Sequence, residues 1–118
     1  MIIHIHGGGF IAMSSSSHEN YLRKWTKRLG VPIFSIDYRL APEHPYPKSL
    51  DDVWQAYNWI IENARQEFDI NLDKIILVGD SAGGNLVLGL VYLLIIMNKR
   101  LPDSIFLAYP GIKYYNTK

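Results

Sequence analysis

Two patterns of apolar residues alternate along the chain. In one, short and mostly apolar runs rich in β-branched residues lack regular polar positions, as in strands buried on both faces. In the other, apolar residues recur three or four positions apart, as on one side of a helix. The predicted strands cover residues 2–6, 32–36, 74–78 and 104–108. The predicted helices begin at Ser16, Ser49 and Ala82 and end near Gly30, near Phe68 and at Asn98.

The alternation of strand and helix indicates a parallel sheet. Parallel neighbours need a crossover connection, which is usually a helix, and strands without polar positions are covered on both faces. The sequence therefore predicts a three-layer α/β sandwich, with residues 1–118 forming one domain.

Capping residues support the first two helix starts. Ser16 is followed three positions later by Glu19, and Ser49 by Asp52, as in a capping box. The residues expected to be buried at helical spacing are Tyr21, Leu22, Trp25 and Leu29 in the first helix and Leu50, Val53, Trp54, Tyr57, Ile61, Ala64 and Phe68 in the second.

A proline-rich connection lies between the second predicted strand and the second helix. Residues 37–47 contain three prolines, so this segment cannot be helical. Arg39 and Glu43 are expected to form an ion pair that holds the connection, with substrate contact as the alternative.

A serine lies between two glycines where the third predicted strand meets the third helix. Residues 79–83 read Gly-Asp-Ser-Ala-Gly. In a nucleophile elbow, a sharp strand-to-helix turn exposes the serine hydroxyl, and flanking glycines avoid Cβ clashes with the neighbouring elements. The motif predicts that Ser81 is a nucleophile, although a small residue in an ordinary tight turn is the simpler interpretation.

A glycine loop follows the first predicted strand, where residues 6–10 read His-Gly-Gly-Gly-Phe. Attack of a serine on a carbonyl group creates an oxyanion, which preorganised backbone N–H groups stabilise. Gly7 and Gly8 can turn both amides towards one point. The amide of Ala82, at the start of a helix, is the predicted third donor.

Other residues of the two motifs are predicted to support the site. His6 and Gly9 belong to the glycine loop, and His6 is expected to fix it through hydrogen bonds rather than to act as a base. Asp80 is too close to Ser81 in sequence to orient a histidine and is expected to anchor the elbow. Phe10 and Tyr38 are possible pocket residues.

The glycine loop and its strand have two alternative interpretations, as a metal site and as a phosphate site. His4 and His6 form a His-x-His pair that could chelate a metal, but no third ligand is evident, so no metal is predicted and His4 is expected to be a hydrogen-bonded core residue. The glycines could also bind phosphate, but the Lys-Ser/Thr pair of a P-loop does not follow them.

Together these motifs resemble the hormone-sensitive lipase family of the α/β-hydrolase fold. The resemblance extends to the segment Asp-Tyr-Arg-Leu-Ala-Pro-Glu-His-Pro-Tyr-Pro at residues 37–47, to Gly84-Asn85-Leu86 after the elbow, and to Tyr109-Pro110. Ser-His-Glu at residues 17–19 resembles the lipase branch itself more than the microbial esterases. The resemblance implies the spatial strand order 2-1-3-4, which brings the glycine loop and the elbow to one crevice.

The catalytic acid and histidine of that family are not found in the chain. Both would follow the serine, but beyond Ser81 there is no histidine or glutamate and only one aspartate, Asp103, in an expected turn. The chain is therefore interpreted as the N-terminal half of a catalytic core, inactive by itself.

Composition adds few constraints. The chain is 48% apolar, has a net charge of +1 and contains no cysteine, so disulfides are excluded and no nucleic-acid partner is indicated. The most apolar stretch is shorter than the roughly 20 residues that a membrane span needs. We expect a cytoplasmic protein, with association with lipid droplets possible for a longer parent. The oligomeric state is not predicted.

The resemblance implies a carboxylic-ester hydrolase of lipid catabolism that acts on an ester or lipid through an acyl-serine, without a cofactor. The alternative is a small-ligand-binding protein like the gibberellin receptor, which resembles the same family but lacks a working histidine. A truncated gene product without activity is a third possibility.

Overall fold

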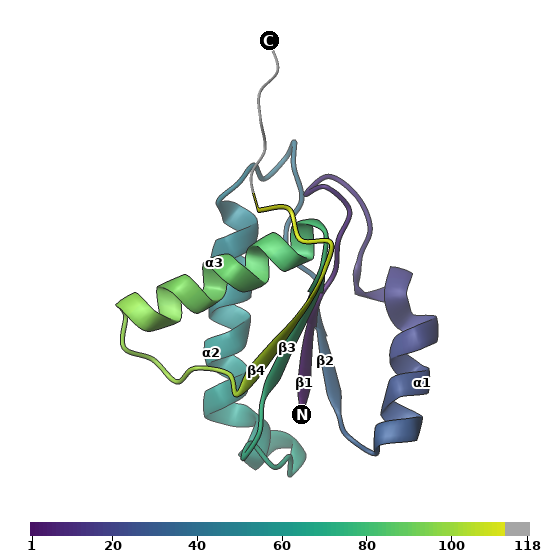
Figure 1. The fold of residues 1–118 in the computed structure, drawn as a ribbon. Helices are drawn as coiled ribbons and strands as arrows, with labels where there is room; N and C mark the ends of the chain where they lie inside the picture. Colours follow the sequence, from purple (N-terminus) through teal and green to yellow (C-terminus); the bar gives the residue numbers. More distant parts are fainter. Residues whose placement is uncertain (113–118) are drawn as a thin grey trace.

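The computed structural model describes residues 1–112. A four-stranded parallel sheet in the order β2-β1-β3-β4 forms its centre (Figure 1), which confirms the predicted fold class and strand order. The strands are β1 (Ile2–Ile5), β2 (Ile33–Ile36), β3 (Ile76–Asp80) and β4 (Ser104–Ala108). The predicted third strand thus ends two residues too early.

Helices cover both faces of the sheet. The elements are the 3₁₀ turn η1 (Ser15–His18) and the helices α1 (Glu19–Leu29), α2 (Lys48–Phe68) and α3 (Ala82–Ile96). Helix α1 lies on one face, and α2 and α3 lie on the other (Figure 1). This is the arrangement that right-handed crossovers produce for this strand order.

The core lies between the sheet and helices α2 and α3. Ile3 and Ile5 of β1 are fully buried there, whereas His4, between them in the sequence, faces α1 and contacts Tyr21. The other fully buried core residues are Val53, Tyr57, Ala64, Ile75, Leu77, Leu86, Val87, Leu90 and Leu94. Burial of each large apolar side chain stabilises the fold by about 1.5–3 kcal/mol.

The predicted start of the first helix is wrong. The N–H of Ser14 donates to the hydroxyl oxygen of Ser17 over 3.1 Å, and the N–H of Ser17 donates to the carbonyl oxygen of Ser14 over 3.1 Å. These bonds close η1 ahead of α1, so Ser16 is not the cap. Glu19 instead pairs with Arg23, one turn along α1.

Two further predictions are wrong because Arg39 pairs with Asp52. They are the capping box at the second helix and the ion pair between Arg39 and Glu43. Asp52 accepts hydrogen bonds of 2.8–3.0 Å from the guanidinium and the backbone N–H of Arg39, so it does not turn back to Ser49. Burial alone would raise the pKa of Asp52, but the hydrogen bonds from Arg39 outweigh it and lower the pKa. This contact fixes the segment 37–47 to α2.

Two residues expected in the core are exposed. Leu29 ends α1 and is 61% exposed, and Phe68 ends α2 and is 55% exposed. Helical spacing identified the buried side of each helix. It did not show that the last residue of each helix lies beyond the part that packs on the sheet.

Candidate active site

Ser81 has the backbone conformation of a sharp strand-to-helix turn. Its φ is 53° and its ψ is −118°, between the end of β3 and the start of α3. The N–H of Ser81 donates to the carbonyl oxygen of Ala108 over 2.9 Å, and its carbonyl oxygen accepts the N–H groups of Asn85 and Gly111. The strand, turn and helix that a nucleophile elbow requires are therefore present, with Ser81 only partly buried.

Close packing joins the elbow to the end of β1. A Cβ atom on Gly83 would clash with the carbonyl oxygen of Ile5 and would lie 2.6 Å from that of His6. Only a residue without a side chain lets the first turn of α3 approach β1 so closely. Elbow and glycine loop are thus neighbours although they are far apart in sequence.

The glycine loop bends back on itself directly after β1. Gly8 has a φ of 124°, and its carbonyl oxygen accepts the N–H groups of Ile11 and Ala12 over 3.2 and 3.1 Å. A Cβ atom on Gly7 would lie 2.7 Å from the carbonyl oxygen of Asp80, the residue before Ser81. The backbone of Gly7 therefore lies against the residue that precedes Ser81 in the elbow.

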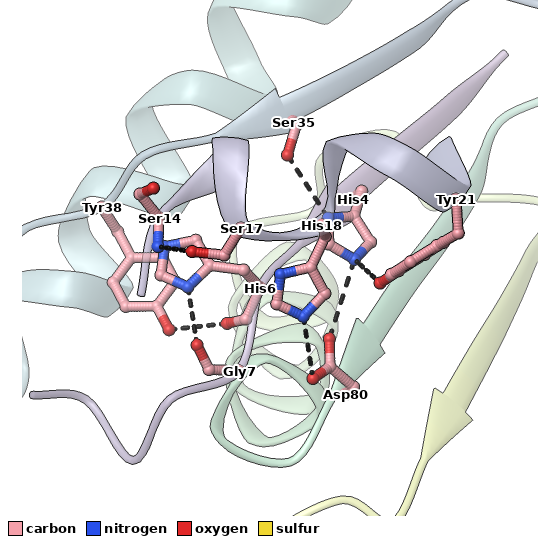
Figure 2. A network of polar contacts seen from close by, with 10 residues as sticks. All are labelled: His4, His6, Gly7, Ser14, Ser17, His18, Tyr21, Ser35, Tyr38 and Asp80. Carbon is pink, nitrogen blue, oxygen red and sulfur yellow. Dashed lines mark hydrogen bonds and ion pairs between the residues drawn. The ribbon is translucent and has the colours of Figure 1, made fainter. Parts of the chain in front are cut away.

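His6 and Tyr38 contact the backbone at the start of this loop. The His6 Nδ1 atom lies 2.7 Å from the carbonyl oxygen of Gly7, and the Tyr38 hydroxyl donates to the carbonyl oxygen of His6 over 2.6 Å (Figure 2). The two rings stack with centroids 4.2 Å apart. Burial lowers the pKa of His6, which favours a neutral ring.

The remaining predicted residues lie around the loop. Gly9 is at its exposed tip with a φ of 64°. Phe10 has its ring 5.9 Å from that of Tyr46, and its carbonyl oxygen accepts the N–H of Ala41. These contacts join the glycine loop to the proline-rich segment.

Asp80 takes part in a second polar cluster, on the α1 face of the sheet (Figure 2). Its Oδ2 atom lies 3.3 Å from His18 Nε2, and its Oδ1 atom lies 3.7 Å from His4 Nε2. His4 Nε2 also lies 3.1 Å from the Tyr21 hydroxyl, and His4 Nδ1 lies 3.3 Å from Ser35 Oγ. Asp80 thus turns away from the helix that follows Ser81 and contacts β1 and η1.

The cluster is buried enough to shift the pKa values of its members. Burial lowers the pKa of His4 to about 4, with the nearby His18 ring acting in the same direction. Burial, followed by the charge of Asp80, raises the pKa of Tyr21 to about 12. At neutral pH His4 is therefore neutral and Tyr21 keeps its proton.

Sequence reasoning did not identify His18 and Tyr21 as members of a cluster. His18 and Asp80 are 62 positions apart in the chain, and no periodicity connects them. The Ser-His-Glu segment at residues 17–19, which carried part of the family resemblance, is the signal that could have marked His18.

Within residues 1–112 no histidine bonds to Ser81, because His4, His6 and His18 make the contacts described above and His44 lies on the exposed proline-rich segment. Asp103 forms two hydrogen bonds with Ile75. Its carboxylate accepts the N–H of Ile75 over 2.7 Å, and its own N–H donates to the carbonyl oxygen of Ile75. It aligns the starts of β3 and β4, consistent with the expected turn residue.

Comparison with known proteins identifies the fold family. A family model described as alpha/beta hydrolase fold matches residues 2–118. The chain belongs to this family. The hormone-sensitive lipase of Mus musculus is 47% identical over 93% of the chain, and the esterase LipI of Mycobacterium tuberculosis is 40% identical over 73% of it.

Solved structures agree with this assignment. The hyperthermophilic esterase of the archaeon Pyrobaculum calidifontis superposes with a TM-score of 0.91 at 31% identity over 98% of the chain. The present alpha/beta hydrolase chain spans 14% of the mouse lipase, 27% of LipI and 38% of the Pyrobaculum esterase. Among the described residues, no helix is both long and apolar enough to cross a membrane.

Proposed function

We propose that the protein hydrolyses carboxylic esters through an acyl-enzyme on Ser81. The observation that carries this proposal is the positive φ of Ser81 at the β3–α3 turn, packed against a glycine loop. A non-glycine residue in such a conformation is strained, and strain of this kind is concentrated at functional sites. The similarity to lipases and esterases supports the same reaction class.

In the proposed reaction, the Ser81 hydroxyl attacks the ester carbonyl and loses its proton to a histidine. The N–H groups of Gly7, Gly8 and Ala82 stabilise the oxyanion, and each such donor contributes about 2.7–4 kcal/mol in comparable enzymes. The alcohol leaves with the proton, and water then hydrolyses the acyl-serine by the same route. Neither a metal nor an organic cofactor takes part in these steps.

The histidine and its acid are proposed to come from outside these 118 residues. The four histidines of the chain all precede Ser81, whereas the family order is serine, acid, histidine. The chain alone should then retain only the roughly 10³–10⁴-fold rate enhancement over water that remains without a triad.

The proposed substrate class is an ester of a lipid. The support is the high identity to hormone-sensitive lipase across nearly the whole chain. A role in lipid catabolism, and a cytoplasmic or lipid-droplet location, are parts of the same proposal.

The test uses the protein in the full length that its gene encodes. We expect hydrolysis of a p-nitrophenyl ester, and labelling of Ser81 by a fluorophosphonate, identified by mass spectrometry of the peptide. Ser81→Ala should abolish both, while Ser16→Ala, an exposed serine of η1, should retain both. Labelling at another residue, or full turnover by the Ser81→Ala variant, would refute the proposal.

A ligand-binding protein of the same fold is the second candidate, because no histidine contacts Ser81 within residues 1–112. It predicts saturable binding of a small apolar carboxylate or ester without turnover. Binding that survives in the Ser81→Ala variant, together with no labelling of wild type, would favour this candidate.

A further inference from the structure

The side chains of His4, His18 and Asp80 converge from three different elements. His4 is in β1, His18 ends η1 and Asp80 ends β3 (Figure 2). One ligand atom of each lies within 4.8 Å of the other two, and His4 and His18 are almost completely buried. Neither the glycine loop nor the proposed acyl transfer uses these three groups together.

The hydrogen bonds of His4 prepare one ring nitrogen as a ligand. With Nδ1 donating to Ser35 Oγ, Nε2 carries a lone pair and accepts the Tyr21 hydroxyl. The same nitrogen faces Asp80 Oδ1 across 3.7 Å, which is too long for a hydrogen bond. A metal ion that binds Nε2 therefore takes the place of the Tyr21 hydroxyl at this lone pair, and Asp80 Oδ1 lies close enough to be a second ligand.

Two buried atoms of the cluster also have no hydrogen-bond partner within the described part of the chain. They are Asp80 Oδ1 and His18 Nδ1. Leaving a buried polar atom unsatisfied costs about 1–3 kcal/mol, and more for a charged group, so such atoms require an explanation. A cation next to Asp80 Oδ1 would supply one.

We propose that His4 Nε2, His18 Nε2 and the Asp80 carboxylate bind a divalent transition-metal ion. Two imidazoles and one carboxylate form a donor set typical of Zn²⁺ and Fe²⁺, whereas Mg²⁺ and Ca²⁺ prefer oxygen ligands. The bond from His4 to Ser35 is the outer contact that orients a ligating histidine.

The spacing of the ligand atoms suits such an ion. Metal bonds of about 2.0–2.2 Å in tetrahedral geometry place ligand atoms roughly 3.3–3.6 Å apart. Asp80 Oδ2 lies 3.3 Å from His18 Nε2, and Asp80 Oδ1 lies 3.7 Å from His4 Nε2. One ligand atom of each residue lies within 4.8 Å of the other two, so binding requires the three side chains to move closer together. A cavity of about 280 Å³, lined by the same three residues and by Tyr21 and Trp25, leaves room for a water ligand.

Bound there, the metal ties β1, η1 and the end of β3 together, next to the elbow. It takes no part in the proposed acyl transfer. Its role is structural, because it fixes Asp80 and thereby the position at which the chain turns into Ser81.

The experiment is a titration of the metal-stripped, full-length protein with Co²⁺, followed by visible absorption, and with Zn²⁺, followed by calorimetry. We expect one ion per chain for wild type, and affinity at least about tenfold lower for His18→Gln and Asp80→Asn. His44→Gln is the matched control, since His44 is an exposed histidine that does not belong to the cluster, and it should bind as wild type does. Circular dichroism of each variant establishes that it is folded.

Equal affinity of wild type and a folded His18→Gln variant would overturn the proposal, as would no binding by wild type at concentrations up to about 1 mM. Where the variants do not fold, X-ray absorption of zinc-loaded wild type decides. Two imidazole ligands are expected, and a spectrum without imidazole scattering would exclude the site.

Discussion

Ser81 combines a reactive position with an unfavourable backbone. Its φ of 53° and ψ of −118° are natural for glycine but strained for a residue with a Cβ atom. The turn persists because three backbone hydrogen bonds hold it, to Ala108 at the end of β4, to Asn85 in the first turn of α3 and to Gly111 beyond β4. The surrounding fold therefore maintains a backbone conformation that a serine would not adopt without these contacts.

This strain should be measurable by comparing two substitutions that both remove the hydroxyl. Ser81→Gly relieves the strain and Ser81→Ala does not, so the glycine variant should be more stable by about 1–2 kcal/mol after the entropy cost of glycine. The midpoints of urea unfolding measure the difference. A glycine variant no more stable than the alanine variant would show that Ser81 is unstrained.

Gly8 and Gly9 offer a second comparison at the scale of one residue, since both have positive φ. A Cβ atom on Gly8 would clash with the carbonyl oxygen of Ala12, whereas one on Gly9 would meet nothing within 4 Å. We expect Gly8→Ala to lower kcat of the full-length enzyme at least about tenfold by displacing one oxyanion donor. Gly9→Ala, the matched control, should have a much smaller effect, and equal kcat values in the two variants would contradict the assigned loop.

At the scale of secondary-structure elements, helix α2 is joined to the connection before β4. The hydroxyl of the fully buried Tyr57 donates to the carbonyl oxygen of Arg100 over 2.7 Å. Burial raises the pKa of Tyr57 to about 12, because the ionised form cannot be hydrated there. The unfolded chain therefore loses this proton near pH 10, before the folded chain does.

Unfolding at alkaline pH should reveal this contact. The free energy of unfolding should fall as the pH rises from about 10 to 12, by at most about 1.4 kcal/mol per pH unit for one tyrosine. Tyr57→Phe should reduce this slope without removing it, because Tyr21 also has a raised pKa. Tyr92→Phe, at an exposed tyrosine, should leave the slope unchanged, and an unaltered slope in Tyr57→Phe would contradict the prediction.

The elements show what could be predicted from the sequence. Apolar runs and the glycines of the two motifs specified the four strands and the elbow, because these depend on local pattern, whereas the order of the strands came from the family resemblance. Side-chain partners were predicted less well. Arg39 bonds to Asp52 rather than Glu43, and His18 reaches Asp80, since such pairs depend on how distant elements pack.

Across the whole molecule, the described residues include large apolar side chains on and next to α3 and β4 that are exposed. Large apolar side chains on α3, on β4 and next to them are 41–77% exposed; they are Tyr92, Ile95, Ile96, Met97, Ile105, Phe106 and Tyr109. Strand β4 is also an edge of the sheet, with unpaired backbone groups. The chain spans 38% of the Pyrobaculum esterase, and we expect the remaining part of such an enzyme to cover these surfaces.

The 118-residue chain by itself should therefore associate. Exposed apolar edge strands template pairing with other chains, and a large apolar patch favours contact between them. Phe106→Lys, which places a charge on β4, should lower the apparent mass in light scattering, because a charge on an edge strand opposes pairing. Leu29→Lys changes an equally exposed apolar residue at the end of α1, away from this edge, and should have little effect. A wild-type chain that is a monodisperse monomer at high micromolar concentration and unfolds cooperatively would show instead that these residues form a self-sufficient domain.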